Sequence, residues 1–413
     1  MKLKLLFYAI FLFQISFSQQ RTCGKDAKMQ ELMNNPIALQ NYINLQNKFE
    51  IELSKIQNKQ SRAASPNQTI IIPIAVHFPS VATNSTSKAC LRILAQSQIN
   101  ILNADYNAAN ADISQWTPAI SAFYPGTAIG NLDVQFVIAT QNHPAGSGLV
   151  NGDLAVTFGT DYLNGADTDS TWNGYVNLVC RDANGNLGYS QLGGVPNVAD
   201  TVVINFDAFG SGAGCTGYVP TSPYNLGRTL THELGHYFNL DHTFAGCTTA
   251  TNCATSGDKI CDTPASNAAV FGCPTAGATT KCSVKTLTMN YMDYTNDACM
   301  YMFTANQVTR MKAYYNTISN QIKTNVLSNN EFLARNFSIE PNPNNGTFKI
   351  NLKEQLNDYS IEIFDVTGRS VFENNFKSQD LQQIISLKNT TTGIYFINIK
   401  SDSSILTRKI LIK

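Results

Sequence analysis

Three of the five histidines in this chain fall in one short stretch, from His232 to His242. His232 and His236 stand four residues apart, so on a helix their imidazoles project from the same side, about one turn from each other. Glu233 lies beside the first of them, and His242 follows the second by six residues. Three imidazoles with a neighbouring carboxylate in this pattern predict a zinc site with a built-in general base.

The imidazoles of His232, His236 and His242 are the expected zinc ligands, and Glu233 has a different role. Its carboxylate would project toward water at the metal, and zinc lowers the pKa of such water toward about 7. Glu233 could then accept a proton from the water and return it to the leaving amine of a peptide bond. The stretch therefore indicates a zinc endopeptidase that acts on proteins or peptides.

A sharp turn must separate the second ligand from the third. A straight helix would carry His242 well past the metal, so the chain has to turn near Asn239. After glycine, asparagine is the residue that best tolerates the left-handed backbone conformation. We therefore expect the active-site helix, from about Leu226 to Phe238, to end in a left-handed turn at Asn239.

Size and charge narrow the class of protein. The chain has 413 residues, which is enough for about two or three folded units plus processed segments. Charged residues make up 14% of it, and the formal net charge is zero. A neutral, weakly charged chain has no electrostatic footprint for nucleic acid or an anionic membrane. Its function must therefore come from a localised site and not from an extended charged surface.

The N-terminus has the layout of a signal peptide over residues 1–18. Lys2 and Lys4 precede an apolar run that ends at Phe17, and small serines flank a plausible cleavage point. A membrane anchor is the alternative, but the run is short for a bilayer span. The mature protein is predicted to be exported, without a transmembrane helix, into surroundings where its ten cysteines can be oxidised.

Residues 19–65 are polar, contain one amphipathic helical pattern, and are most simply a pro-segment. Within them, Arg21-Thr22-Cys23-Gly24 resembles the cysteine switch of matrix metallopeptidase pro-segments. A thiolate can be the fourth ligand of a zinc ion, so Cys23 could keep a precursor latent. A disulfide partner is the alternative, because the remaining nine cysteines are odd in number.

The elements that must position the site lie in residues 66–325. Apolar and alternating patterns predict strands at 69–78, 131–140, 174–181 and 201–206, and helices at 91–108 and 304–318. A glycine-rich segment, 185–194, separates the last two strands. This order predicts an α+β domain, in which a twisted mixed sheet supports the active-site helix and backing helices. His77 and His143 are expected to be core or surface histidines, not ligands.

Several segments together resemble the pappalysins, a metzincin family of zinc peptidases, over about residues 69–315. The resemblance is carried by residues 224–231, by His242-Thr243-Phe244, and by Asn290-Tyr291-Met292-Asp293-Tyr294. It implies a Met-turn at Met292, an apolar floor beneath the zinc, for which ordinary core packing is the alternative. It also implies that Tyr294 stabilises the tetrahedral intermediate, as a phenol near zinc could by donating to an oxyanion.

The loop-rich segment between His242 and Met292 contains five cysteines, and Cys299 follows it. In an exported protein this spacing favours disulfides over a second zinc cluster, and the pairing cannot be deduced from sequence. The family resemblance implies two bridges in this region, made among Cys247, Cys273, Cys282 and Cys299.

The same segment contains Gly257-Asp258-Lys259-Ile260-Cys261-Asp262-Thr263-Pro264, which is similar to the calcium loop of the family. The expected contributors to this structural Ca²⁺ site are Gly257, Asp258, Cys261 and Thr263. Carboxylate, hydroxyl and carbonyl oxygens at close spacing suit a hard cation. An aspartate-rich turn without a metal is the alternative.

Asp297 stands five residues past Met292, at a position similar to the family acid that lines the pocket for the residue after the scissile bond. A carboxylate there would favour arginine or lysine through charge-assisted hydrogen bonds. If so, cleavage before Arg62 could remove the pro-segment autocatalytically. A solvated loop acid is the alternative.

The pattern changes after a polar linker at residues 326–336. Short strands separated by Asn, Gly and Asp turns predict a small all-β sandwich over residues 337–413. Its Pro-Asn-Pro, Asp-x-x-Gly and Gly-x-Tyr signals resemble the C-terminal sorting domain of type IX secretion substrates. The resemblance implies contact with that secretion machinery and a place outside, or on the surface of, a bacterium with an outer membrane. A carbohydrate-binding module is the alternative, but it lacks an aromatic platform here.

Two classes of function remain open. One is a secreted zinc endopeptidase made as a latent precursor. The other is a surface adhesin that keeps the metzincin shell only as a binding module. Glu233 favours the enzyme, because a binding module has no chemical need for a general base at that position.

Overall fold

The computed structural model describes residues 20–59, 70–159, 170–198, 200–327, 337–352, 359–377, 382–388, 390–401 and 404–413. The expected signal peptide at 1–18, Arg62 and most of the expected linker lie outside these ranges. Among the described residues, no helix has the length and apolar character needed to cross a bilayer. The two largest hydrophobic cores lie before and after residues 328–336, so the chain has two main units.

A six-stranded sheet forms the centre of the first unit, in the order β2-β1-β4-β6-β5, with β3 also paired to β1. Its strands are β1 (Ile70–Phe78), β2 (Val134–Ile138), β3 (Val156–Phe158), β4 (Val176–Cys180), β5 (Gly188–Tyr189) and β6 (Thr201–Ile204). The pairs are parallel except for β5, which runs antiparallel to β6 and forms one edge. That edge borders the candidate site.

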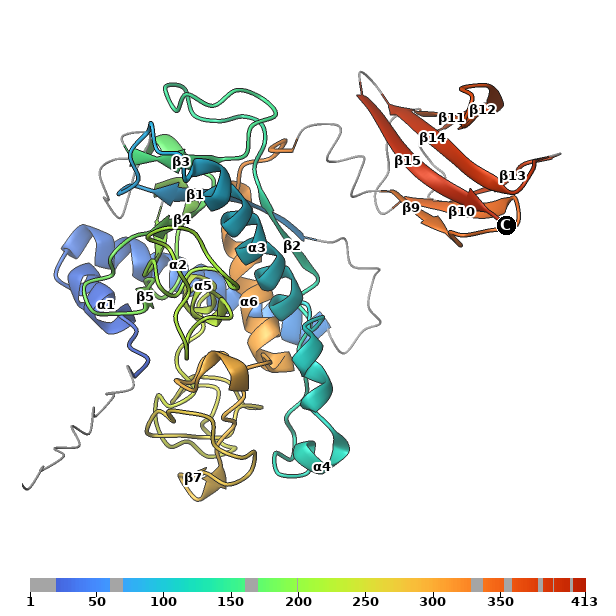
Figure 1. The fold of residues 1–413 in the computed structure, drawn as a ribbon. Helices are drawn as coiled ribbons and strands as arrows, with labels where there is room; N and C mark the ends of the chain where they lie inside the picture. The colour runs from blue at the N-terminus through green and yellow to red at the C-terminus, as the bar shows by residue number, and fades with distance from the viewer. Residues whose placement is uncertain are drawn as a thin grey trace, which may run out of the picture.

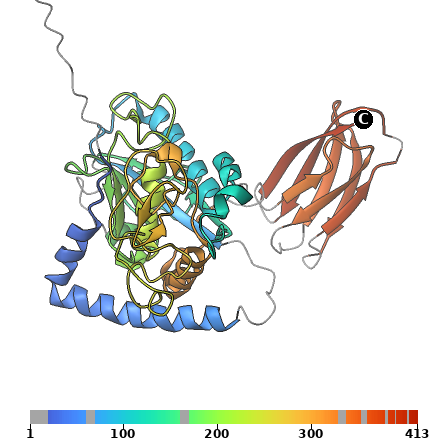
Figure 2. The ribbon, with the colours of Figure 1, turned by 90° about the horizontal axis from the view of Figure 1, so that it is seen from below.

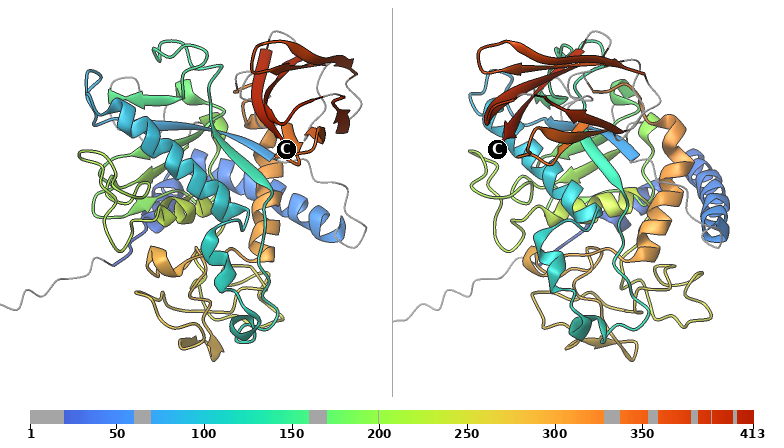
Figure 3. Two further views of the ribbon diagram at one scale, coloured as in Figure 1. Left: turned by 45° about the vertical axis from the view of Figure 1, so that its right-hand side comes forward. Right: turned by 90° about the vertical axis from the view of Figure 1, so that its right-hand side faces the viewer.

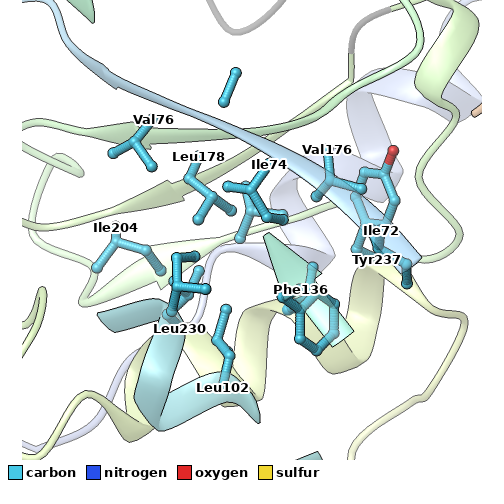
Figure 4. Packing of buried hydrophobic residues seen from close by; sticks show 14 of the residues in the cluster. Ile72, Ile74, Val76, Leu102, Phe136, Val176, Leu178, Ile204, Leu230 and Tyr237 are labelled. Carbon is cyan, nitrogen blue, oxygen red and sulfur yellow. The ribbon is translucent and has the colours of Figure 1, made fainter. Parts of the chain in front are cut away.

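The strands are apolar on both faces because the sheet is buried on both sides, as is usual for parallel strands. Figure 4 shows Ile74 of β1 and Leu178 of β4 packed near Leu102 and Leu230. These two leucines belong to α3 (Lys88–Tyr106) and α5 (Arg228–Tyr237). The two helices therefore pack against the sheet, and this core fixes the position of α5.

The helix α6 (Ala305–Ile318) begins with a complete capping box between Thr304 and Gln307. Its buried face includes Tyr314, whereas Tyr315 is only partly buried. The other helix of this unit, α4 (Pro118–Ser121), is a single turn.

Two helices, not one, form the N-terminal segment: α1 (Lys25–Met33) and α2 (Pro36–Lys59). The single helical pattern predicted from sequence corresponds to α2, which begins at Pro36 because proline is accepted at the first turn of a helix and not in its interior, and α1 is an additional helix. Figure 2 shows α2 running along the side of the first unit, next to α6. The ring of Phe49 from α2 lies 5.8 Å from that of Tyr314, between ring centroids.

The segment between α5 and α6 has little regular structure beyond the hairpin of β7 (Thr280–Lys281) and β8 (Val284–Lys285). It lies at one end of the first unit (Figures 1 and 3). Three disulfides close it, namely Cys247–Cys282, Cys253–Cys261 and Cys273–Cys299. A fourth, Cys90–Cys215, ties α3 to the loop before α5. Cys23 and Cys180 are free.

The second unit is a sandwich of two antiparallel sheets, β13-β10-β9 and β12-β11-β14-β15. Its strands are β9 (Phe337–Glu340), β10 (Thr347–Leu352), β11 (Tyr359–Asp365), β12 (Ser370–Phe376), β13 (Gln382–Ser386), β14 (Gly393–Ser401) and β15 (Ser404–Ile412). Inward residues alternate with outward ones, as in Tyr359, Ile361 and Ile363 of β11. The predicted α+β domain followed by an all-β sandwich is confirmed.

Candidate active site

The helix α5 carries the first two histidines in a fully buried position. Every residue from Arg228 to Tyr237 is buried. Its start is fixed by Arg228, whose Nη1 donates to the Tyr291 hydroxyl at 2.7 Å and the Met300 carbonyl at 2.9 Å. Gly227 precedes the helix at φ 75°, a left-handed conformation that suits glycine. The helix therefore starts two residues later than the predicted Leu226.

The three imidazoles converge on one point. Potential ligand atoms of His232, His236, His242 and Cys23 all lie within 4.8 Å of one another. His232 Nδ1 lies 2.6 Å from the Tyr291 carbonyl oxygen, and His236 Nδ1 lies 2.7 Å from that of Leu240. Because a carbonyl only accepts, each Nδ1 carries the proton, and each Nε2 presents a lone pair to the centre.

These residues fit a zinc ion. The Nε2 atom of His232 is buried and has no hydrogen-bond partner, which is costly unless a ligand takes its lone pair. Burial, followed by neighbouring positive charge, holds the pKa of His232 well below its ordinary value, and burial lowers that of His236 to about 4. The imidazoles are therefore neutral, the form that binds a metal. Three histidines with one further position match a catalytic zinc site.

Asn239 makes the turn between the second and third ligands. It adopts φ 68°, the left-handed conformation expected from the sequence. Its amide hydrogen bonds to the His236 carbonyl at 2.8 Å, and its own carbonyl accepts from Arg310 Nε at 2.9 Å. The chain reverses there, which brings His242 Nε2 within 3.1 Å of His236 Nε2.

Glu233 points into the same centre and is buried. Burial raises the pKa of its carboxyl to about 8, and a hydrogen bond with Cys23 opposes the shift. The edge strand lies close against it, since a Cβ on Gly188 would stand 2.8 Å from Glu233 Cγ. Only glycine fits there, so the sheet edge and the carboxylate are held side by side.

Met292 lies beneath the histidines. It is fully buried, and its Sδ would stand 2.5 Å from a Cβ on Gly235, so the sulfur packs against the backbone of α5. The Asn290 side chain holds this turn, because its Oδ1 accepts from the Met292 amide at 2.9 Å while its Nδ2 donates to Gln307 Oε1. The turn at Met292 is therefore fastened to the start of α6.

Tyr294 stands beside the ligands, with its ring centroid 5.0 Å from that of His242 and 5.7 Å from that of His232. Burial and then the nearby Cys23 and Glu233 raise the pKa of its phenol, so it remains a donor. Phe244 stacks on His242 with 4.5 Å between ring centroids and also lies 4.8 Å from the Tyr294 ring. A hydrogen bond links Tyr294 to the backbone of Cys23.

The N-terminal segment crosses the site by adding a short extended piece to the edge strand. Cys23 bridges Gly188 in parallel, with Leu187 N–H donating to the Thr22 carbonyl and Gly24 N–H to the Gly188 carbonyl, both at 3.0 Å. This places Cys23 Sγ 3.3 Å from Glu233 Oε2. A Cβ on Gly24 would stand 2.9 Å from Tyr189 Cβ, so a glycine follows the cysteine for steric reasons.

Arg21 fills a buried pocket next to the histidines. Its Nη2 pairs with Asp297 Oδ1 at 2.5 Å, and only 1% and 0% of the two side chains are exposed. Its other nitrogens lie 3.3 Å from the Thr295 carbonyl and from Thr229 Oγ1, and its guanidinium lies over the Tyr224 ring. Asp297 Oδ2 also accepts from the amides of Leu226 and Arg228. Asp297 is therefore not a solvated loop acid.

The loop at 257–263 uses its polar groups internally. Asp258 is buried, and its two carboxylate oxygens accept from the Ile260 amide at 3.1 Å and from Thr263 Oγ1 at 2.5 Å. Burial raises the pKa of Asp258 to about 7. Gly257 adopts φ 63°, and Cys261 Sγ is in a disulfide, which leaves only its backbone carbonyl for a cation.

The two remaining histidines bind nothing at the site. His77 Nδ1 lies 2.8 Å from Thr157 Oγ1, and its Nε2 lies 3.0 Å from Asn177 Oδ1. His143 Nε2 contacts the Asp153 carbonyl. Both therefore have structural roles in this fold.

Sequence reasoning missed the role of Arg21 and the edge strand β5. Gly188 and Tyr189 fall in a glycine-rich segment that shows no apolar alternation, so periodicity gives no strand there. Arg21 stands two residues before Cys23 in the motif. Its partner Asp297 is 276 residues away, so no local sequence pattern indicates that the two side chains pair.

Comparisons with known proteins agree with this geometry. A family model described as pregnancy-associated plasma protein-A matches residues 162–316, and one described as a secretion system C-terminal sorting domain matches residues 338–413. Among solved structures, a promirolysin mutant from Tannerella forsythia is 29% identical with a TM-score of 0.53, over 72% of this chain and 94% of that one.

Fungal proteins are similar by sequence. An extracellular metalloprotease of Colletotrichum graminicola is 45% identical over 111 residues, which cover 25% of this chain and 38% of the relative. One from Arthroderma gypseum is 28% identical over 269 residues, covering 64% of this chain and 79% of the relative. The chain thus spans less than two fifths of the length of the Colletotrichum relative.

A neutral three-histidine centre with an adjacent carboxylate, carried by a helix that packs on a mixed sheet, has the arrangement of a metzincin-type metallopeptidase fold. The chain belongs to the pappalysin family and ends in a type IX secretion sorting domain. The sorting domain places the protein at the cell surface or outside the cell.

Proposed function

We propose that this protein is a secreted zinc endopeptidase that cleaves peptide bonds before arginine or lysine and is made as a latent precursor. The observation that carries the proposal is the convergence of three neutral imidazoles and Glu233 on one buried point beside the edge strand β5. A zinc ion held by His232, His236 and His242 would supply a Lewis acid and lower the pKa of water.

Side chains and backbone groups of this chain would perform the proton transfers, stabilise the oxyanion and bind the substrate. Glu233 accepts a proton from the attacking water and delivers it to the leaving amine. Tyr294 donates its phenolic hydrogen to the oxyanion of the substrate, which suits a phenol kept protonated. The backbone groups of Leu187 and Gly188 at the edge strand, which bind residues 22–24, can bind a substrate chain in the same way.

Replacing Glu233 by glutamine tests the reaction. Glu233→Gln keeps the shape and removes the base, so hydrolysis of a protein substrate should fall by about 10²-fold or more, while zinc content measured by metal analysis stays near one ion per chain. Equal hydrolysis by both proteins would contradict the proposed mechanism and favour the alternative, an inactive metzincin shell acting as an adhesin.

The basic preference is supported by Arg21. A chain segment laid along the edge strand inserts a guanidinium into the pocket of Asp297, Thr229 and Tyr224. Arginine has the shape and charge that this buried carboxylate can pair with, and an uncharged side chain would leave Asp297 buried without a countercharge. We take this pocket as the site for the residue after the scissile bond.

Latency is supported by the same segment. Cys23 has a free thiol that lies within 4.8 Å of the potential ligand atoms of the three histidines, which supports the switch hypothesis over the disulfide alternative. Arg21 fills the pocket, and the backbone of Cys23 hydrogen bonds to Tyr294. Residues 19–65 thus act as a pro-segment that blocks the ligands, Tyr294 and the pocket together, and cleavage before Arg62 would begin its removal.

Calcium at Gly257, Asp258, Cys261 and Thr263 is a further part of the proposal. Asp258 is a buried carboxylate, and burial raises its pKa to about 7. A bound Ca²⁺ would favour the charged carboxylate and draw on nearby hydroxyl and carbonyl oxygens.

The sorting domain at residues 337–413 would engage the type IX secretion machinery.

A further inference from the structure

The turn between the second and third zinc ligands is in contact with the pro-segment helix α2. Asn239 Nδ2 donates to Gln46 Oε1 at 3.0 Å, and Gln46 Nε2 donates to Asn239 Oδ1 at 3.3 Å. Among the described residues, the Asn239 side chain therefore makes two hydrogen bonds, and both are with Gln46. Asn239 is fully buried under the helix.

The turn itself does not need this amide. At φ 68°, glycine would adopt the same conformation at less cost than asparagine. An asparagine costs backbone strain there, and what it adds is a donor and an acceptor aimed at α2. The choice of residue is thus explained by the contact with Gln46 and not by the turn.

Further contacts surround this amide pair. The guanidinium of Arg310, whose Nε binds the Asn239 carbonyl, lies 4.7 Å from the ring centroid of Phe49. Phe49 is fully buried against Tyr314. On the other side of the turn, Lys25 Nζ pairs with Asp241 Oδ1 at 2.6 Å.

We propose that Asn239, Asp241, Arg310 and Tyr314 form a docking surface for the pro-segment, and that residues 20–59 stay bound to it after the link to the catalytic region is cut. The occupant is α2, recognised through the Gln46 amide and the Phe49 ring. The surface does not depend on the Cys23 thiol. The activated enzyme would therefore need a second event, loss or degradation of the cut pro-segment, before the cleft opens.

The proposal rests on the pro-segment role proposed above, but its test measures binding and not hydrolysis. The full chain carries Glu233→Gln to prevent self-processing, with a site-specific protease sequence inserted after Ser61. After cutting, gel filtration reports the fraction of fragment that co-elutes with the catalytic region. A chase with an excess of an unlabelled peptide that comprises residues 20–61 gives the rate at which the cut fragment dissociates.

The fragment should co-elute in the parent, and Gln46→Ala should speed its dissociation by about tenfold, as expected for loss of two amide hydrogen bonds. Gln40→Ala is the matched control, because Gln40 bonds only Asn44 among the described residues, on the exposed side of the same helix. It should leave the rate unchanged. Gln46→Ala lies outside the catalytic region, so its effect does not depend on the folding of that region.

A double-mutant cycle separates recognition from general damage. Asn239→Gly should match Gln46→Ala, and combining the two should add little, because each removes the same pair. Cys23→Ser in each background should preserve the difference. Immediate loss of the fragment from the parent, equal rates for Gln46→Ala and Gln40→Ala, or fully additive effects in the cycle would each overturn the proposal. Retention of the fragment by the Glu233→Gln chain, together with no hydrolytic activity in the cut chain that keeps Glu233 after the fragment is removed, would refute the proposed function and leave the docking surface intact.

Discussion

Asp297 serves both the fold and the pocket. One carboxylate oxygen accepts from the amides of Leu226 and Arg228, where α5 begins, and the other faces the guanidinium of Arg21. An acid at the N-terminus of a helix is favoured by the helix dipole. The residue that would select a basic side chain is thus held rigidly by the helix that carries two zinc ligands.

Asp297→Asn is expected to remove the preference for basic residues and keep the fold, because the amide oxygen can still accept from the backbone. For peptides with arginine after the scissile bond, kcat/KM should fall by about 10- to 100-fold, the value of a buried hydrogen bond to a charged group. Peptides with alanine at that position should change little. A peptide panel in which the variant keeps the basic preference would refute the pocket assignment.

Asp200 is a half-buried carboxylate whose charge depends on the fold. It accepts from the Val195 amide at 2.9 Å and from the Gln191 side chain. Burial raises its pKa to about 6, and the hydrogen bond from Val195 partly opposes this. Since an unfolded aspartate titrates near about 3.9, the folded state holds the proton more tightly.

The pH dependence of stability follows from that sign. The contribution of Asp200 is fully present below about pH 4 and is lost as pH rises through about 6, so stability falls over this range. The Asp200→Asn side chain does not titrate. As pH rises between these values, the free energy of unfolding of the variant should therefore increase relative to that of the wild type, by up to about 3 kcal/mol. Urea unfolding at several pH values measures the gain, and parallel curves for the two proteins would contradict it.

Residue types and short spacing predicted the convergence of the three histidines beside Glu233 and the turn at Asn239, because all of these residues lie on one helix and its exit. Arg21 and Gln46 could not be assigned in this way. Their partners, Asp297 and Asn239, are distant in sequence, and a contact between distant polar residues leaves no periodic pattern. Only the folded chain brings them together.

At the level of elements, the positions of strands could be predicted where burial imposes an apolar pattern on the sequence. The strands β1, β2, β4 and β6 are apolar runs in a buried sheet, so their positions followed from hydrophobicity within a few residues. The strand β5 has two residues, one of them Gly188, and its place is set by pairing with β6. Such an edge has no hydrophobic signature, although it borders the cleft.

Three disulfides and a small hydrophobic cluster that includes Leu287, Met289 and Met302 hold the loop between α5 and α6, which has little regular secondary structure. If Ca²⁺ binds at Asp258, a calcium-selective chelator should lower the melting temperature by several degrees, as expected for removal of a ligand that binds only the folded state. Asp258→Asn should remove this sensitivity. Zinc content should be measured alongside, and an unchanged melting temperature at constant zinc would count against the site.

Across the whole molecule, the N-terminal segment shares a core with the catalytic region, whereas the sorting domain has its own. Phe49 of α2 belongs to the first core, and the second is built only from residues after 336. The N-terminal segment, which we propose to be a pro-segment, is thus part of the fold of the first unit in this structure. Its removal would expose apolar surface along α6 as well as open the cleft.

Latency should therefore depend on several contacts and not on the thiol alone. Cys23→Ala in the full chain should raise peptide hydrolysis above that of the uncut wild type, but only partly, because Arg21 still fills the pocket and α2 is still docked. Adding Arg21→Ala should raise it further. Thr22→Ala is the matched control, since the Thr22 hydroxyl only contacts the exposed Gly185 carbonyl. Initial rates, taken before any processing appears on a gel, measure the effect. If both Cys23→Ala and the double variant stay as latent as the wild type, residues 21–23 do not block the site, and the role proposed for the pro-segment is wrong.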